Sequence, residues 1–342
     1  MQKAAEQAGL DSLTALRGFA ALTVLLFHAG VGSRGYLGVD LFFVLSGFVL
    51  THAYGEKFRV FEAGTYRAFL QARLARIYPL HLLTLACLLP LYGQASQFSG
   101  VALIHNLLLT QAPWFGESWN FPAWSISAEW HAYLIFPLLA GLVAERGRRG
   151  LLAVAAASIA TVGALYLAAD MFSGNPQGAL AFTPAVLIRV LGEFVAGMAL
   201  YRLHRRGWAT KLAGSGAMCP AILAVVVAAG MIPGTDPLIV VLLPALLYAC
   251  VSNDGAMRRL LNGAAAQYLG RISYSVYMIQ AVVQFALLRA LPHASPFLFG
   301  TLFVAGTLLA AAPVSRFIEY PARNWLRDLA LPRPTPRATA RP

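Results

Sequence analysis

The chain is poor in charged residues, and acidic ones are the scarcest. Only 12% of its 342 residues are charged, whereas 58% are hydrophobic. A typical soluble domain has about 25% charged and about 45–50% apolar residues, because much of its surface must face water. The composition therefore excludes a conventional soluble enzyme as well as a disordered or fibrous chain. It indicates a protein that lies in a membrane.

Several motifs are also missing. The three cysteines (Cys87, Cys219 and Cys250) lie in apolar runs without metal-ligand spacing, so we expect core thiols and no metal site. No Gly-x-Ser-x-Gly elbow marks a serine nucleophile. No internal repeat is evident, which disfavours an inverted-repeat transporter. The first apolar run lacks a small-residue cleavage site, so we expect it to remain in the mature protein.

Long apolar runs predict an all-α polytopic membrane protein. A transmembrane helix needs about 20 mostly apolar residues, and ten runs approach that length. They lie near residues 14–31, 36–54, 78–95, 124–144, 150–170, 182–201, 216–232, 237–252, 273–290 and 296–315. The run 101–111 is too short to span and predicts an interfacial or re-entrant helix. We expect one membrane domain over 1–330 and a Pro/Arg-rich tail without regular structure at 331–342.

The basic residues predict the orientation. The chain has 26 Lys and Arg against 14 Asp and Glu, a formal net charge of +12. With ten crossings and both termini in the cytoplasm, the basic clusters all fall on the cytoplasmic side, as the positive-inside rule requires. The opposite side keeps only Arg34 and Arg289. The charge therefore needs no nucleic-acid partner. The clusters are Lys57/Arg59/Arg67/Arg73/Arg76, Arg146/Arg148/Arg149, Arg202/Arg205/Arg206/Lys211, Arg258/Arg259/Arg271 and the residues from Arg316 onward.

Two ionisable residues lie inside the first predicted span, where such groups are costly and mark functional sites by default. Arg17 and His28 are eleven residues apart. At about 100° per residue this is three turns plus roughly 20°, so both side chains point the same way, about 16 Å apart. We expect Arg17 at the cytoplasmic end and His28 in the outer half of the bilayer. The alternative is that Arg17 snorkels to the interface and His28 only packs between helices.

A carboxylate in the second span is predicted at a depth similar to that of His28. Asp40 lies near the outer end of this span. A carboxylate beside an imidazole fixes its tautomer and raises its basicity, as a general base requires. Alternatively, Asp40 caps the start of its helix after Gly38. Ser46-Gly47 in the same span favours close helix packing over a nucleophile.

The fourth predicted span begins Trp-Ser-Ile-Ser-Ala-Glu-Trp-His at Trp124. Ser125 and Glu129 share one helix face at i,i+4 spacing, and Ser127 and His131 share another. Glu129 is about one and a half turns inside the outer boundary, where a carboxylate needs a partner. We therefore expect Glu129 to act in catalysis. We expect Trp124, Ser125 and Ser127 to contact substrate, although the tryptophans alternatively serve as interfacial anchors.

Two arginines on the cytoplasmic side suit an anion. Arg73 and Arg76 share a helix face just before Pro79, and arginine is suited to bidentate phosphate recognition. The alternative is a basic segment that only sets the topology. In the sixth span, Arg189 and Glu193 are four residues apart and predict an ion pair on the helix surface.

At these residues the chain resembles the acyltransferase 3 family, bacterial integral-membrane O-acyltransferases that include glycan acetylases. The matching segments occur in the family's order and extend over almost the whole chain. They are Leu16-Arg17-Gly18 through Phe27-His28, Gly38-Val39-Asp40-Leu41-Phe42-Phe43-Val44-Leu45-Ser46-Gly47-Phe48, Arg73-Leu74-Ala75-Arg76-Ile77-Tyr78-Pro79, Trp124-Ser125-Ile126-Ser127-Ala128-Glu129, Ser273-Tyr274-Ser275-Val276-Tyr277 and Phe317-Ile318-Glu319-Tyr320-Pro321-Ala322-Arg323.

The resemblance implies an acyl-CoA donor, typically acetyl-CoA, on the cytoplasmic face of a bacterial inner membrane. It also implies a carbohydrate or small-molecule hydroxyl acceptor reached from the membrane or the outer side. His28 would be essential for transfer, Arg17, Arg73 and Arg76 would bind the donor, and Glu129 would lie in the active site. One departure is Gln280, which stands where members often have a histidine.

We therefore expect a membrane-bound O-acyltransferase. Arg17, Arg73 and Arg76 would hold the donor phosphates, and the extended pantetheine arm is long enough to bring the thioester from Arg17 to the neighbourhood of His28. His28, oriented by Asp40 or Glu129, would take the proton of the acceptor hydroxyl. A covalent acyl-histidine intermediate is equally compatible with the sequence. The alternative function is a transporter or flippase of a glycan or lipid precursor, with the buried charges along its pathway.

Overall fold

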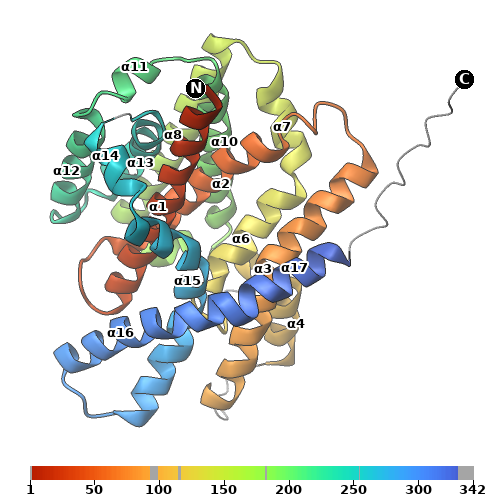
Figure 1. The fold of residues 1–342 in the computed structure, drawn as a ribbon. Coiled ribbons are helices and arrows are strands. Elements are labelled where there is room, and N and C mark those ends of the chain that lie inside the picture. Colours follow the sequence, from red (N-terminus) through yellow and green to blue (C-terminus); the bar gives the residue numbers. More distant parts are fainter. Residues whose placement is uncertain (1, 93–98, 115–116, 182, 254, 330–342) are drawn as a thin grey trace, which may run out of the picture.

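The computed structural model describes residues 2–92, 99–114, 117–181, 183–253 and 255–329, and every regular element in these ranges is a helix (Figure 1). The expected all-α architecture is confirmed for this part of the chain. The tail at 331–342 lies outside the described residues. In chain order the elements are α1 (Gln2–His28), η1 (Gly35–Leu37), α2 (Gly38–Tyr54), α3 (Ala63–Tyr92), α4 (Gly100–Leu108), α5 (Gln111–Trp114), α6 (Ala123–Leu134), α7 (Phe136–Ala144), α8 (Arg148–Ser173), α9 (Pro176–Ala181), α10 (Ala185–Arg205), α11 (Thr210–Ala213), α12 (Met218–Gly230), α13 (Asp236–Ser252), α14 (Ala256–Leu261), α15 (Ala264–Ala290), α16 (Pro296–Val314), η2 (Ser315–Glu319) and α17 (Tyr320–Asp328).

The helices that can cross a membrane number fewer than the sequence predicts. Within the described ranges, six helical segments are long and apolar enough, and a seventh is added if α6 and α7 count as one bent crossing. The ten predicted crossings are therefore not confirmed. α10 is 21 residues long but carries Arg189, Glu193, Arg202 and Arg205. α12 and α13 are apolar but only 13 and 17 residues long.

The predicted span 124–144 is broken in two. α6 and α7 meet at an angle of 61°, with Ile135 between them and Pro137 in the first turn of α7. Proline lacks an amide hydrogen and its ring clashes with the carbonyl four residues earlier, so the helix ends before it. The bend leaves the α6 segment, which holds Glu129, free to adopt its own direction inside the molecule.

α3 is longer than the sequence predicts. It runs through Pro79 and Pro90 over 30 residues, so the expected third span is the second part of a helix that begins at Ala63. The hydroxyl of Tyr274 in α15 donates to the carbonyl of Ile77, 2.6 Å away, close to Pro79. Arg73 and Arg76 therefore lie on a helix continuous with the span.

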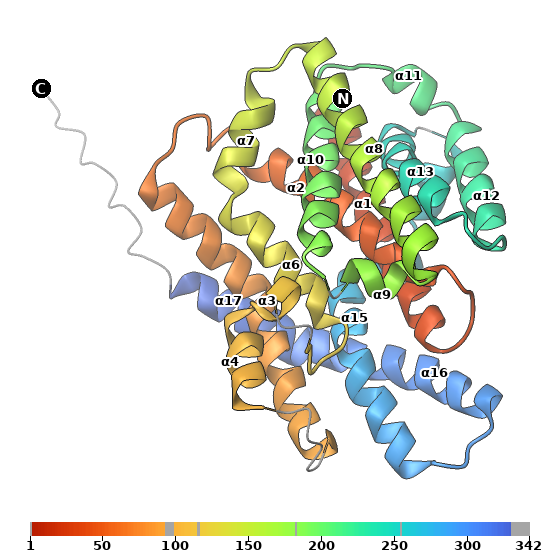
Figure 2. The same cartoon turned by 180° about the vertical axis from the view of Figure 1, so that it is seen from behind.

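Two helix pairs form the centre of the molecule: α1 packs against α15, and α2 packs against α10. A Cβ on Gly47 of α2 would lie 1.9 Å from the carbonyl oxygen of Phe194, and one on Gly197 of α10 would lie 2.0 Å from that of Val44. Small residues let backbones approach this closely. Figure 2 shows α8 beside α10 on the other face of this centre.

The C-terminal helices form a single rod along one edge of the molecule (Figure 1). α16 continues without a break through η2, a π-helical stretch, into α17, which packs against α3. Glu319 at the end of η2 is only 1% exposed, so the rod turns a carboxylate toward the interior. The apolar stretch at 101–111 forms the nine-residue α4, too short to span, as expected.

Candidate active site

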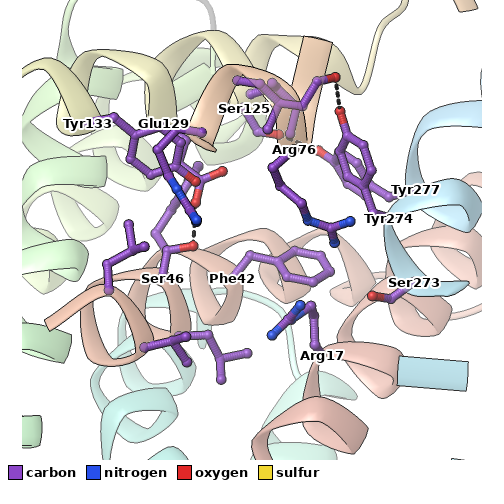
Figure 3. A pocket seen from close by; sticks show the side chains of 17 residues that line it. Arg17, Phe42, Ser46, Arg76, Ser125, Glu129, Tyr133, Ser273, Tyr274 and Tyr277 are labelled. Atoms are coloured by element: carbon purple, nitrogen blue, oxygen red, sulfur yellow. Dashed lines mark hydrogen bonds between the residues drawn. The ribbon is translucent and has the colours of Figure 1, made fainter. Parts of the chain in front are cut away.

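A cavity of about 170 Å³ lies where α1, α2, α3, α6 and α15 meet. We term it the arginine cavity, because three arginines line it. Figure 3 shows Arg17 and Arg76 converging on the space beside Phe42. The residues that line it are Arg17, Phe42, Phe43, Leu45, Ser46, Val49, Leu50, Arg73, Arg76, Ile77, Ser125, Ile126, Glu129, Tyr133, Ser273, Tyr274 and Tyr277. The structure thus brings together the predicted residues Arg17, Arg73, Arg76, Ser125 and Glu129.

The three guanidinium groups of the arginine cavity differ in their partners. Arg76 forms an ion pair with Glu319 of η2. Arg73 lies 5.4 Å from the ring centroid of Tyr54 and donates to its hydroxyl over 3.4 Å. Arg17 makes no hydrogen bond or ion pair with any described residue. Two of the three cations therefore lack a direct acidic partner and are available to an anion.

Among the described residues that line the arginine cavity, Glu129 is the one with an acidic side chain. Ser46 of α2 donates a hydrogen bond to its Oε1, and the carboxylate interacts electrostatically with Arg73 and Arg17. It therefore balances part of the positive charge of the cavity. These groups are the partners that a carboxylate in an apolar helix requires.

His28 lies in a second cavity, which we term the histidine cavity. Its volume is about 30 Å³, enough for about one water molecule. Like the arginine cavity it is bordered by α1, α6 and α15, but it also reaches α10 and the segment before α2. It is lined by Val24, His28, Tyr36, Val39, Phe121, Pro122, Trp124, Gln177, Arg189 and Tyr277. Arg17 and His28 of the same helix thus border different cavities.

The partner of His28 differs from the prediction. His28 Nδ1 lies 3.0 Å from Oε1 of Gln280 in α15, and Phe121 packs edge-on at 4.7 Å between ring centroids. The sequence predicted that Asp40 or Glu129 would orient this imidazole, and that prediction is wrong for the described residues. α15 presents an uncharged amide at this point, while both carboxylates are held by other partners.

Asp40 forms a buried ion pair instead. Arg189 of α10 donates through Nε to Oδ1 over 2.9 Å and through Nη2 to Oδ2 over 2.7 Å. Tyr166 of α8 donates to Oδ1 over 2.8 Å. Both carboxylate oxygens thus accept hydrogen bonds from Arg189 and Tyr166, and neither is paired with His28. The predicted pair of Arg189 with Glu193 is also wrong, because the guanidinium reaches across to α2.

Tyr277 of α15 lines both cavities. Its hydroxyl lies 2.7 Å from Ser125 Oγ and donates to the carbonyl of Pro122 over 2.9 Å. Phe42 packs edge-on against its ring at 5.7 Å between centroids. Figure 3 shows Ser125 and Tyr277 together at one side of the arginine cavity. This hydrogen-bonded group therefore forms the common wall of the two cavities.

The other two residues predicted to contact substrate, Trp124 and Ser127, lie in different surroundings. Trp124 lines the histidine cavity, with the Arg189 guanidinium 5.3 Å from its ring centroid. Ser127 lines neither cavity. Its hydroxyl lies 2.8 Å from the carbonyl oxygen of Leu109 and accepts from the amide of Ala112 over 3.1 Å. Ser127 thus secures the segment between α4 and α5, and the structure does not bring it to either cavity.

Sequence reasoning assigned no role to Gln280, Tyr277 or Glu319. Glu319 lies beyond the predicted span 296–315, and the sequence indicated it only as part of the family-like segment from Phe317 to Arg323. Tyr277 and Gln280 are uncharged, and their roles arise from contacts with α1 and α6. Among the described residues, no group of three or more His, Cys, Asp or Glu side chains is placed to hold a metal ion.

Two known proteins that are similar to this chain carry the names of acyltransferases. Acyltransferase MdmB of Streptomyces mycarofaciens is 30% identical over 319 residues, 80% of this chain and 79% of that protein. YrhL of Bacillus subtilis, which carries the name of a peptidoglycan O-acetyltransferase, is 29% identical over 170 residues, 42% of this chain and 26% of that protein. A shorter stretch of 80 residues, 22% of this chain and 41% of the relative, is 50% identical to protein 2 in the picA locus of Rhizobium radiobacter. No solved structure matches the chain.

The family comparison extends over most of the molecule. The family model described as an acyltransferase domain matches residues 10–316, a range that contains every residue of both cavities. The match includes the motifs around Arg17, His28 and Glu129. The chain therefore belongs to the acyltransferase 3 family.

Proposed function

We propose that the protein transfers an acyl group, acetyl in the simplest case, from acyl-CoA to a hydroxyl group of a glycan or small-molecule acceptor. The observation that carries the donor assignment is the pair of unpaired cations in the arginine cavity. Arg17 and Arg73 make no ion pair with a described residue, and a guanidinium binds phosphate strongly and with defined geometry. Family membership supports acyl transfer, and the name of YrhL supports a carbohydrate acceptor.

In this proposal the donor binds in the arginine cavity and the acceptor hydroxyl enters the histidine cavity. The donor phosphates would bind at Arg17 and Arg73, with the thioester directed toward Tyr277, and the acceptor hydroxyl would enter beside His28. The acceptor oxygen then bonds to the thioester carbonyl carbon while His28 takes its proton, and the carbon–sulfur bond breaks. The CoA thiolate leaves and receives the proton from His28, which restores the imidazole. We place this reaction in a multi-pass protein of a bacterial inner membrane, with the donor on the cytoplasmic side.

The test uses the full chain in lipid nanodiscs with labelled acetyl-CoA and soluble peptidoglycan fragments. Label in the fragments and release of free CoA are both measured. We expect His28→Ala to bind the donor with wild-type affinity but to lose transfer by about 10²-fold or more, the usual contribution of a general base. We expect Arg17→Gln to weaken donor binding by about 10-fold or more, because a charge-assisted hydrogen bond contributes about 1.5–3 kcal/mol.

Arg289→Gln is the matched control for Arg17→Gln, because Arg289 is exposed and lines neither cavity. A wild-type protein that neither binds acyl-CoA nor cleaves its thioester would behave as the alternative transporter does and would overturn the proposal. Transfer at the wild-type rate by His28→Ala would remove His28 from the mechanism. Mass spectrometry of envelope glycans from cells with and without the protein identifies the natural acceptor by a lost acyl mass.

A further inference from the structure

The hydrogen bond between α1 and α15 at His28 fixes more than a ring orientation. His28 Nδ1 lies 3.0 Å from Gln280 Oε1, between residues 252 positions apart in the chain. Gln280 is fully buried, whereas His28 is half-buried. Which groups donate and which accept in this contact decides the chemistry of the imidazole.

The orientation of the Gln280 amide follows from its second contact. Its Nε2 donates to the backbone carbonyl of Tyr277 over 2.8 Å. A carbonyl can only accept a hydrogen bond, so the amide nitrogen must face Tyr277 and the amide oxygen must face His28. That oxygen can also only accept. The hydrogen between Gln280 and His28 must therefore reside on Nδ1 of the imidazole.

A neutral imidazole carries one hydrogen, so a hydrogen on Nδ1 leaves a lone pair on Nε2. We propose that Gln280 is a positioning residue that holds His28 in the Nδ1–H tautomer and thereby makes Nε2 the proton acceptor. This inference rests on the proposed function in one respect: only that function identifies the proton that Nε2 accepts as the proton of the acceptor hydroxyl. The tautomer itself follows from the two contacts of the Gln280 amide, with Nδ1 of His28 and with the carbonyl of Tyr277.

An amide suits this position in a way that a carboxylate does not. Nδ1 carries a hydrogen both in the neutral tautomer and after Nε2 has gained a proton, so the bond to Gln280 persists through the whole cycle. The amide has no net charge, and it does not stabilise the protonated ring as a carboxylate would. Phe27 and Phe121 pack edge-on against the ring, 5.2 and 4.7 Å between centroids. Packing thus confines the ring, and Gln280 selects the tautomer.

Three variants separate the tautomer from mere packing. Gln280→Met has a similar length but no acceptor, and Gln280→Glu keeps an acceptor and adds charge. Gln284→Met is the matched control, one turn further along α15 and outside both cavities. The other titratable side chains that line the histidine cavity, Tyr36, Arg189 and Tyr277, are unchanged in all three.

The first readout is the ¹⁵N chemical shifts of protein labelled at histidine, with the His28 signals assigned by their loss in His28→Ala. We expect a protonated Nδ1 and an unprotonated Nε2 in the wild type and in Gln284→Met, and a mixture of tautomers in Gln280→Met. A wild-type His28 with its hydrogen on Nε2, or Gln280→Met with the wild-type pattern, overturns the inference. This readout needs no activity, so it still decides the tautomer if the proposed acyl transfer fails.

The second readout is acyl transfer as a function of pH. We expect Gln280→Met to lower kcat about 10- to 100-fold, a loss typical of removing a group that orients a functional histidine, with KM for acetyl-CoA unchanged. We expect Gln280→Glu to keep transfer at high pH but to move the acidic limb of its pH profile upward, because the added charge favours the protonated ring. A purely structural role would give the same loss at every pH in both variants, and that result contradicts the inference.

Discussion

A charged side chain between transmembrane helices requires a partner, because hydrocarbon offers it none. Asp40 meets this requirement with Arg189, and Glu319 with Arg76. Arg17 has no such ion pair among the described residues. The unusual positions of Arg17, Asp40 and Arg189 were readable from the apolar runs around them. Their pairing was not, because the two pairs join residues 149 and 243 positions apart and nothing local in a sequence encodes such contacts.

Exchanging Asp40 for Asn distinguishes a structural carboxylate from a catalytic one. The change removes the carboxylate that pairs with the Arg189 guanidinium, which is 1% exposed, and breaking a buried pair in this way costs about 3–5 kcal/mol. We expect a marked fall in the thermal unfolding temperature of the purified protein in detergent. Adding Arg189→Met should recover part of the loss, because it removes the buried charge that has lost this ion pair. Wild-type stability combined with lost acyl transfer would instead assign Asp40 to the chemistry.

At the scale of helices, apolar runs predicted where elements exist better than where they end. α1, α2, α8 and α15 lie where expected, although each of α1, α8 and α15 extends beyond its predicted run. Proline had opposite effects in two helices: it separates α6 from α7, whereas α3 continues through it. The residue type alone could not distinguish these cases. Neighbouring helices determine whether the freed backbone groups find new partners, and those neighbours are a tertiary feature.

The crossing of α2 and α10 provides a test at this scale. A methyl group at Gly197 would meet the backbone of α2 at 2.0 Å, and a fixed backbone cannot yield as a flexible side chain does. We expect Gly197→Ala to lower the free energy of unfolding by about 1–3 kcal/mol, the usual cost of overpacking, measured by denaturation in detergent. Gly141→Ala in α7 is the control, since nothing lies within 4 Å of its Cβ position. If Gly197→Ala and Gly141→Ala were equally stable, α2 and α10 would be able to move apart without loss of unfolding free energy, and the prediction would be wrong.

At the scale of the whole molecule, the sequence predicted which residues matter but not that they divide between two cavities. The eleven-residue spacing of Arg17 and His28 predicts that they share a helix face. Arg17 nevertheless borders the arginine cavity and His28 the histidine cavity. The division arises because Tyr277 and Ser125 meet between them. A wall built from three helices depends on their relative rotation and tilt, which packing decides and periodicity does not.

The number of crossings is open to a direct test. Ten crossings place α8, α10, α12, α13 and α15 between residues 147 and 293, so Gly147 and His293 would lie on opposite sides. If only the long apolar helices cross, α8 and α15 alone intervene, and both residues would lie on the same side. We expect Gly147→Cys to react with a membrane-impermeant maleimide only after the inner membrane is permeabilised. We expect His293→Cys to react in intact cells.

The native cysteines are replaced by alanine in both reporters. Gly147 suits this use because it is exposed and has open space around its Cβ position, and His293 is exposed as well. Labelling of both positions on one side would contradict ten crossings. A reversed pattern would keep an odd number of crossings between the two positions but contradict the orientation that the basic clusters predict.

The distance in sequence between Asp40 and Arg189 also determines when during synthesis the two residues can pair. The ribosome completes Asp40 149 residues before it reaches Arg189, an interval of roughly 7–30 s at about 5–20 residues per second. During this time α2 resides in or beside the translocon without the arginine that pairs with its carboxylate, and an unpaired ionised group in an apolar helix is costly. α2 and α10 can therefore join only late in synthesis. Until then the nascent chain exposes a lone charge that membrane chaperones and quality-control proteases are able to detect.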